Sequence, residues 1–277
     1  MLNQGPLQWM ERRKSWRDYT SELIAPKKLE FLQKTFQEIK PPFGNQIGLE
    51  IVNFKGDIKP FLTYGFIKGA NTFIAGKVST SSPMNWEDYG WAMEHLILVA
   101  TGLEIDTCWL GGTFRRTCFS KKLELKKDET IPAVVAIGCG KQQRSFRDQV
   151  IRTIAASHTR KLWATLFFEN DFSTPLIQTT EEYSTALNMI RLAPSAANRQ
   201  PWRILKQKDT FHFYLKRSAG YDQHKKADLQ RVDMGIAFLH FDWALREFKT
   251  EGKWIQETPD VTKPMDMEYI ASWKKNS

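Results

Sequence analysis

A nine-residue pattern occurs twice in this chain and constrains its architecture more than any other feature. Residues 88–96 and residues 233–241 both follow Asp-x-Gly-x-Ala-x-x-His-apolar, and the two copies are 145 residues apart. Trp109 and Trp254 keep the same spacing. Each copy begins with an acid that suits a helix start and continues with apolar residues on almost every side, which is typical of a buried helix. The repeat predicts two related halves packed together like a fused dimer.

A weaker correspondence extends this repeat. Residues 42–46 precede a predicted strand at 47–53, much as residues 194–200 precede a predicted strand at 202–205, although the spacing differs by eight residues. The alternative is a chance likeness between two helices. If the repeat is genuine, we expect a first half at residues 1–165, a second half at residues 166–277, and a binding site at their junction.

Composition favours a globular protein that works in the cytoplasm. The 277 residues are 42% hydrophobic, which is enough for a substantial core. The longest apolar runs, 95–100 and 131–137, are too short to cross a bilayer, and the N-terminus has no signal-like block, so we expect no membrane partner. The net charge of +9 is spread over lysine pairs bordered by acids, which favours a solvated surface over a nucleic-acid-binding face.

The segment from Arg191 to Arg203 suggests contact with a ligand. Residues 181–192 have helical apolar spacing, Pro194 ends that helix, and a strand pattern follows at 202–205. Between helix and strand lie small and amide-bearing side chains that would let a flat, polar-edged ligand approach the backbone. The alternative is an ordinary Asn-bearing loop after a helix.

Three further segments offer polar or bare-backbone groups. Residues 11–19 hold four cations and a serine, which suits phosphate binding, although a charged helix end is the alternative. Residues 101–113 end near two adjacent glycines whose backbone could approach a planar ring, or could form a simple turn. Residues 157–163 add two neighbouring cations.

Several catalytic and metal-binding patterns are missing. Gly138-Cys-Gly140 lacks the third glycine of a dinucleotide-binding fingerprint, and Ser195 is not part of Gly-x-Ser-x-Gly. The five histidines have no metal-ligand spacing, and the three cysteines suggest neither disulfides nor a zinc site. We therefore expect no metal, assign no catalytic side chain, and expect His95 and His240 to be satisfied core or interface residues.

The four segments together resemble the nitroreductase family. The resemblance rests on the order Arg13-Lys14-Ser15-x-Arg17, Trp109-Leu-Gly-Gly112, Arg160-Lys161 and Pro194-Ser-x-x-Asn198-x-Gln-Pro-Trp202. It is closest to a subgroup in which two half-domains are fused. The resemblance implies an α+β nitroreductase-like fold with a central, antiparallel-rich sheet flanked by helices, and FMN held non-covalently at the junction of the halves. It also implies that NAD(P)H delivers hydride to flavin N5, leaves, and is replaced by an electron acceptor such as a nitroaromatic or a quinone.

The resemblance assigns the FMN contacts residue by residue. The phosphate and ribityl chain would be held by Arg13, Lys14, Ser15 and Arg17, assisted by Arg160 and Lys161. The second half would contribute Pro194, Ser195, Ala196 and Asn198. Backbone N–H groups of Leu110, Gly111 and Gly112 would stabilise negative charge near flavin N5 and N1. Lys14 departs from the arginine that the family usually has at this position.

The two halves carry unequal parts of this motif set. The turn at residues 42–45 lacks a serine, and nothing like Arg-Lys-Ser-x-Arg begins the second half. We therefore expect one FMN per chain in a monomer that resembles a dimer, and further self-association stays open. Two rival hypotheses are a non-catalytic flavin-binding protein of the same fold and a basic nucleic-acid-binding protein.

Overall fold

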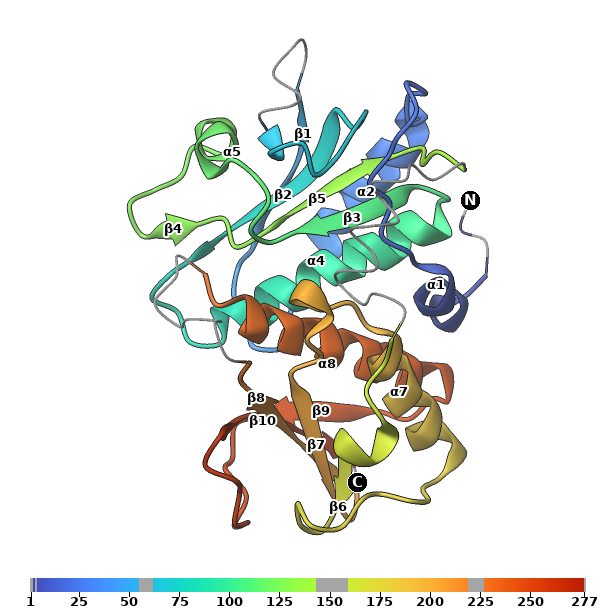
Figure 1. Ribbon diagram of the computed structural model, residues 1–277, viewed down its shortest axis with the longest axis vertical. Helices are drawn as coiled ribbons and strands as arrows, with labels where there is room; N and C mark the ends of the chain where they lie inside the picture. Colours follow the sequence, from blue (N-terminus) through green and yellow to red (C-terminus); the bar gives the residue numbers. More distant parts are fainter. Residues whose placement is uncertain (1, 3, 55–61, 143–158, 219–226, 277) are drawn as a thin grey trace.

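Two five-stranded sheets lie at opposite ends of the molecule, and helices fill the space between them (Figure 1). This computed structural model describes residues 2, 4–54, 62–142, 159–218 and 227–276. Within these ranges, none of the helices combines the length and the apolar character that a membrane span needs.

The first sheet is antiparallel throughout, and its strand order is β1-β2-β5-β3, with β4 paired to β2. The strands are β1 Gly48–Asn53, β2 Thr72–Ser79, β3 Asp106–Leu110, β4 Glu129–Thr130 and β5 Val134–Gly138. Helix α5, Arg116–Lys122, covers its outer face, where Phe119 packs edge-on against Phe54 and Phe73. This separate apolar cluster lets the first sheet bury both of its faces.

The second sheet has the order β6-β7-β8-β10-β9. Its strands are β6 Phe167–Glu169, β7 Trp202–Gln207, β8 Thr210–Lys216, β9 Gly252–Ile255 and β10 Met267–Lys275. Only the β6–β7 pair is parallel in this sheet. The α+β class and the two fused halves are confirmed, but each half has a sheet of its own in place of one central sheet.

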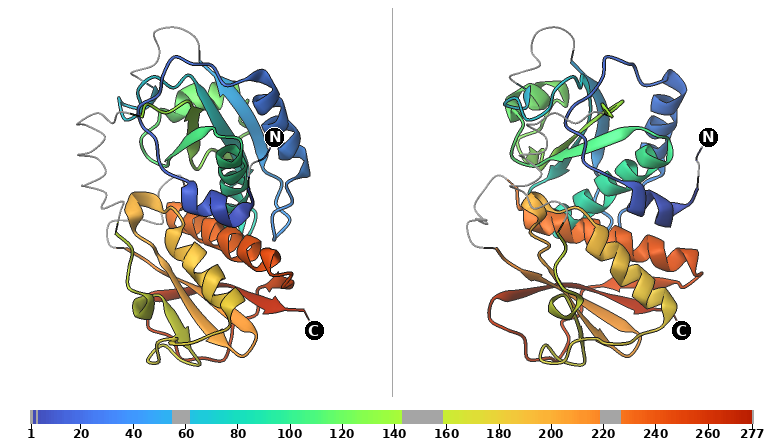
Figure 2. Two further views of the ribbon diagram at one scale, coloured as in Figure 1. Left: turned by 90° about the vertical axis from the view of Figure 1, so that its right-hand side faces the viewer. Right: turned by 45° about the vertical axis from the view of Figure 1, so that its right-hand side comes forward.

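Helices α1 Pro6–Arg12, α4 Asn85–Gly102, α7 Glu181–Leu192 and α8 Leu229–Glu247 lie between the two sheets, and α2 Pro26–Glu38 lies beside the first sheet (Figure 2). Two short 3-10 turns are η1 Trp163–Thr165 and η2 Ala196–Asn198. Helix α4 packs on β2 and β3, and α8 packs on β7 and β8. Both copies of the nine-residue pattern lie in these two helices, which are buried on nearly every side, as their apolar sequences predict.

Helices α4 and α8 cross at two glycines. A Cβ on Gly90 would collide with the carbonyl oxygen of Val232, and a Cβ on Gly235 would collide with the carbonyl oxygen of Glu87. Both contacts have the 145-residue offset of the sequence pattern, since residue 87 corresponds to 232 and residue 90 to 235. The two backbones can therefore touch only because both positions lack a side chain.

The two histidines of the pattern have different surroundings. His240 is fully buried and bonds at both ring nitrogens, to Met189 and to Glu94. The expectation of a satisfied residue fails for His95, because its buried Nδ1 has no hydrogen-bond partner among the described residues. Its ring instead packs edge-on against Trp91 and Trp243, and burial lowers its pKa to about 4.

Candidate cofactor site between the two halves

The turn that follows α7 has an unusual backbone. Ala197, Asn198 and Gln200 have φ angles of 48°, 54° and 47°, in the left-handed region that residues with a Cβ rarely adopt. Such angles persist only where surrounding contacts hold them, and they concentrate at functional sites. The contacts that hold this turn therefore indicate how the site is built.

A buried acid on α8 and a hydroxyl within the turn fix its start. The Ala196 N–H donates to both carboxylate oxygens of Asp233, at 2.9 and 3.1 Å. The Gln200 N–H donates to Ser195 Oγ at 2.9 Å. Burial raises the pKa of Asp233 well above its ordinary value. Ser195 therefore shapes the turn through its side chain.

The first half contains a matching arrangement. Asp88, the counterpart of Asp233 on α4, accepts hydrogen bonds from the backbone N–H groups of Phe43 and Asn45 at 3.0 and 2.9 Å. The first acid of each sequence repeat thus holds a turn that precedes a strand of its own half, β1 in the first half and β7 in the second. The turn in the first half has no residue that plays the part of Ser195.

Gln200 joins the turn to the segment that begins at Thr159. Its side-chain oxygen accepts from the Lys161 N–H at 2.9 Å, and its amide nitrogen donates to the Asn198 carbonyl oxygen at 3.2 Å. Asn198 donates to Thr159 O at 2.9 Å and accepts from Arg160 Nη1 at 3.2 Å. Gln200 lies in the sequence motif but was not among the predicted site residues. Its burial, at 2% exposed, identifies it as the hub of these contacts.

Three arginines gather beside this turn. Burial lowers the pKa of Arg160, and the nearby charges of Arg13 and Arg191 lower it further. The buried Nε atoms of Arg13 and Arg191 have no hydrogen-bond partner among the described residues. Arg191 begins the motif segment, yet sequence reasoning did not select it, because only the fold brings the last turn of α7 toward Arg13.

A single buried carboxylate faces this group of arginines within the described part of the chain. Glu94 Oε1 lies 3.8 Å from Arg13 Nε and 3.0 Å from His240 Nε2. The Trp109 indole N–H donates to Glu94 Oε2 at 2.8 Å. The side chains of Glu94 and His240 are fully buried. Three guanidinium groups against one acid leave a positive excess that suits an anion such as a phosphate.

The other predicted residues of the N-terminal segment lie in different surroundings from Arg13. Lys14 is exposed, Ser15 forms an isolated parallel bridge with Thr107, and the Arg17 guanidinium lies 5.2 Å from the centre of the Phe66 ring. Ser15 and Arg17 thus contact residues of the first half. Arg13, Arg160 and Asn198, in contrast, lie together beside the turn.

Lys161 has other partners than its neighbour Arg160. Its Nζ donates to the Gln200 carbonyl oxygen at 3.3 Å, and Arg203 Nη1 donates to the same oxygen at 3.2 Å. Burial and the charges of Arg203 and Lys216 lower the pKa of Lys161 to about 8. Lys161 therefore belongs to a second group of cations beside β7 and β8.

The predicted glycine loop lies at the start of α8. Leu110 is the last residue of β3 and pairs with Val134, so the loop proper begins at Gly111. A Cβ on Gly111 would lie 2.8 Å from Leu229 Cδ1, whereas a Cβ on Gly112 would meet no heavy atom of the described residues within 4 Å. The Gly112 backbone thus has open space beside it.

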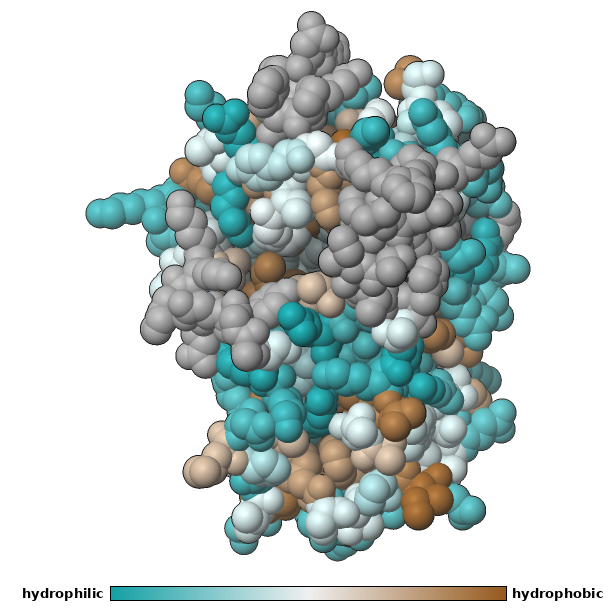
Figure 3. Space-filling model, viewed as in Figure 1, coloured by the Kyte–Doolittle hydropathy of each residue, from teal (hydrophilic) through white to brown (hydrophobic). Residues whose placement is uncertain are grey.

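Helix α8 links these predicted elements. Leu229 meets the glycine loop, Asp233 holds the turn, and His240 reaches Arg13 through Glu94. The rise of an α-helix places residues 229 and 240 about 16 Å apart along its axis. On this side of the molecule, hydrophilic residues gather at the level of α8 (Figure 3). The arrangement suits an elongated ligand with an anionic end near Arg13.

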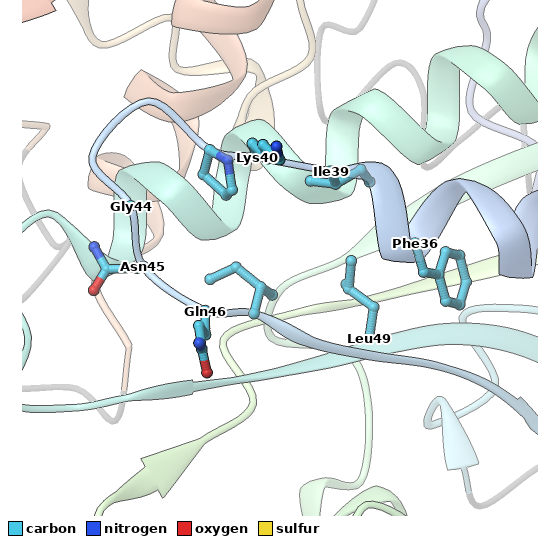
Figure 4. A pocket seen from close by; sticks show the side chains of 9 residues that line it. Phe36, Ile39, Lys40, Gly44, Asn45, Gln46 and Leu49 are labelled. Atoms are coloured by element: carbon cyan, nitrogen blue, oxygen red, sulfur yellow. The ribbon is translucent and has the colours of Figure 1, made fainter.

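A cavity of about 520 Å³ lies beside the other turn, in the first half (Figure 4). It opens between the end of α2 and the start of β1, and Phe36, Ile39, Lys40, Asn45 and Leu49 are among the residues that line it. The turn at residues 42–45 is the counterpart of the turn held by Asp233. None of the predicted cofactor contacts lines this cavity. In the described residues, no cluster of three or more histidines, cysteines or acids could hold a metal.

One family model matches most of the chain. The family model described as "Putative TM nitroreductase" matches residues 7–245. Among solved structures, a putative nitroreductase from Thermotoga maritima has 19% identity and a TM-score of 0.64, over 100% of this chain and 96% of that one. At this identity the likeness establishes the fold. The comparison with curated proteins found no match.

Other solved structures cover about half of the chain. A putative NADH oxidase from Clostridium acetobutylicum has 21% identity and a TM-score of 0.41, over 49% of this chain and 89% of that one. A nitroreductase with bound FMN from Desulfitobacterium hafniense has 18% identity and a TM-score of 0.42, over 54% of this chain and 97% of that one.

Proposed function

This chain belongs to the nitroreductase family that the matching model describes, and from that premise we propose that it binds FMN between its halves and acts as an FMN-dependent oxidoreductase. The reductant is NADH or NADPH, bound transiently, and the acceptor is a nitroaromatic, a quinone or a similar small molecule. Bound FMN would supply the hydride-transfer chemistry. The residues of the chain bind the cofactor, orient it and shape its electrostatic surroundings.

The phosphate end of the proposed site carries the strongest support. Burial lowers the pKa of Arg160, and Arg13 and Arg191 lie near enough to lower it further. The buried Nε of Arg191 has no hydrogen-bond partner in the described residues. Guanidinium groups bind phosphate oxygens through short, charge-assisted hydrogen bonds. A dianionic phosphate would therefore offset the repulsion among these cations. Lys14, Ser15 and Arg17 extend this proposed contact along the ribityl chain, and Lys161 has a supporting place behind Gln200.

The second half supplies the turn that would meet the flavin ring. Hydrogen bonds of the turn to Asp233 and between Gln200 and Ser195 fix its backbone. The side chains of Ala196 and Ala197 are small, so they leave room beside that backbone. Pro194 and Asn198 frame this turn and tie it to α7 and to Arg160. A ring can approach such a backbone closely.

The glycine loop would serve the reactive edge of the ring. The space beside Gly112 lets backbone N–H groups of residues 110–112 point toward developing negative charge. That role requires no side chain that gains or loses a proton, so no catalytic acid or base is assigned. We further propose that the halves span residues 1–165 and 166–277, that both contribute to one site, and that the enzyme works in the cytoplasm.

The first experiment separates an enzyme from a flavin-binding protein. Purified protein should be yellow, and NADH or NADPH should bleach the flavin under anaerobic conditions; a nitroaromatic or quinone should then restore its colour. Tightly bound FMN that neither nucleotide reduces would favour the non-catalytic hypothesis. A colourless protein that also fails to bind added FMN would contradict the proposal entirely.

Paired substitutions test whether residues from the two halves meet at one flavin. Arg13→Ala removes a proposed phosphate contact, and Asn198→Ala loosens the turn, so each should weaken FMN binding by about tenfold or more. Fluorescence titration of the apoprotein measures both dissociation constants. Lys274→Ala, at the far end of β10, is a matched charge control that should bind FMN like the unaltered chain. Normal affinity in either site variant would show that its residue lies outside the site.

A further inference from the structure

Glu94 links the arginine group to both halves of the molecule. Its helix, α4, belongs to the first half, and its carboxylate contacts Arg13 after α1, Trp109 on β3 and His240 on α8. The carboxylate is fully buried, so its charge is not screened by bulk water. A change in this one side chain would thus reach Arg13 directly.

The hydrogen bonds of His240 fix the proton arrangement around Glu94. Met189 O only accepts, so His240 Nδ1, at 3.0 Å, must carry a proton and donate. Nε2 and Glu94 Oε1 are also 3.0 Å apart, and two bare acceptors would repel at that distance. One proton therefore lies between these two atoms, and Glu94 is held in a fixed orientation.

This arrangement occurs on one side of the repeat only. The repeat counterpart of His240 is His95, whose Nδ1 lacks a hydrogen-bond partner in the described residues, and the counterpart of Glu94 is Leu239. Packing of two related helices therefore does not require a carboxylate at this position. The acid occurs where the chain also has Arg13, on the side of the proposed FMN site.

We propose that Glu94 is a positioning residue: it holds the Arg13 guanidinium in place for the phosphate of FMN, and it couples that contact to α8 through His240. This inference rests on the proposed function. The contact is with Nε of Arg13, which leaves the terminal Nη nitrogens for the anion. A guanidinium fixed in this way loses less freedom when the phosphate binds.

Glu94→Gln removes the contact with Arg13 and keeps the packing of the side chain. A glutamine side chain has the same shape; its oxygen can accept from Trp109, and its N–H can donate to Nε2 of neutral His240. Both interhelical hydrogen bonds are thus kept, while the oxygen that faces Arg13 Nε is replaced by an N–H group, which cannot accept from a guanidinium. If Glu94 positions Arg13, the variant binds phosphate less well. If it only offsets the charge of Arg13, the variant binds phosphate more tightly, so the sign of the change decides between the two roles.

Comparison of FMN with riboflavin separates positioning from a general structural role. The two ligands differ by the phosphate alone, so the ratio of their dissociation constants reports on the phosphate contact. The unaltered chain should prefer FMN by at least about 100-fold. Glu94→Gln should lower this preference about tenfold with riboflavin affinity unchanged, and it should have no further effect in the Arg13→Ala background.

Glu87→Gln is the matched control. Glu87 lies on the same helix, is equally buried and bonds to Arg231, seven residues from Glu94. Its substitution should leave the FMN-to-riboflavin preference at the value of the unaltered chain.

Each outcome bears on the inference. An unchanged preference in Glu94→Gln, tighter FMN binding, or an equal loss of both ligands would overturn the positioning role and leave the proposed function standing. Failure of the unaltered chain to bind either flavin would overturn the proposed function and this inference with it. If Glu94→Gln does not fold, Arg13→Ala must itself abolish most of the preference for FMN, and an intact preference would overturn the inference.

Discussion

A histidine at the same place in each repeat has opposite surroundings in the two halves. His240 bonds to Met189 and Glu94, whereas His95 lies between the rings of Trp91 and Trp243. An imidazole among apolar rings is stable only when neutral, so burial, and to a lesser extent Arg246, lowers the pKa of His95 to about 4.

The lowered pKa of His95 predicts a loss of stability in acid. A depressed pKa gives stability that is complete above the unfolded value near 6.5 and lost as the pH falls through about 4. His95→Phe keeps a ring at this position and removes the titration. Between pH 6.5 and pH 4 the unaltered chain should therefore lose up to about 3 kcal/mol more than the variant. Urea unfolding at several pH values measures this difference, and parallel curves for the two proteins would contradict it.

At the scale of elements, patterns local in sequence are predictable and long-range contacts are not. The apolar spacing of residues 181–192 and the strand pattern after Pro201 correspond to α7 and β7. The holding of the turn by Asp233, 37 residues from Ala196, depends on how α8 packs. The sequence likewise does not predict the contact of Glu94 with His240, because the two residues are 146 positions apart and meet only through the packing of α4 and α8.

An acid holds each of the two turns, but only one turn belongs to the proposed FMN site. We therefore expect both acids to contribute to stability and only Asp233 to contribute to FMN binding. Asp233→Ala leaves the Ala196 N–H without its acceptor, and Asp88→Ala does the same to the N–H groups of Phe43 and Asn45. Each substitution should lower the free energy of unfolding by about 1–3 kcal/mol. Under conditions in which both variants are folded, only Asp233→Ala should bind FMN more weakly.

Chemical unfolding and flavin titration on the same samples test this separation. Equal loss of FMN affinity in both variants would mean that the first-half turn also contributes to the site. Full affinity in Asp233→Ala would mean that the strained turn at Ala197 and Asn198 keeps its shape without the acid.

At the scale of the whole molecule, the crossing of α4 and α8 holds the halves together. Gly90→Ala and Gly235→Ala each place a Cβ against a carbonyl oxygen of the opposite helix. In an open helix this exchange would stabilise by about 1 kcal/mol, but here the helices must separate, at a cost of about 1–3 kcal/mol or more. The midpoint of thermal unfolding should fall by a similar amount in both variants. A rise in either midpoint would contradict the close crossing.

The halves are alike in backbone and unlike in chemistry. Both have an acid that holds a turn, but Ser195, Glu94 and Arg13 have no counterparts in the matching site. The sequence motifs already predicted this imbalance for Ser195 and Arg13, but not for Glu94. The different partners of Arg160 and Lys161, Asn198 Oδ1 and the Gln200 carbonyl oxygen, were not predictable, because adjacent residues in a loop have no fixed relation until the fold is known.

The number of FMN molecules bound per chain tests the central claim most directly. Apoprotein of known concentration is titrated with FMN, and the break in flavin fluorescence gives the number of sites. We expect one FMN per chain, since the Arg13 group and the turn at Ser195 form a single complete site. Two FMN molecules per chain would show that the first-half turn also forms a site, and no binding would show that the arginines and the turn do not form a flavin site.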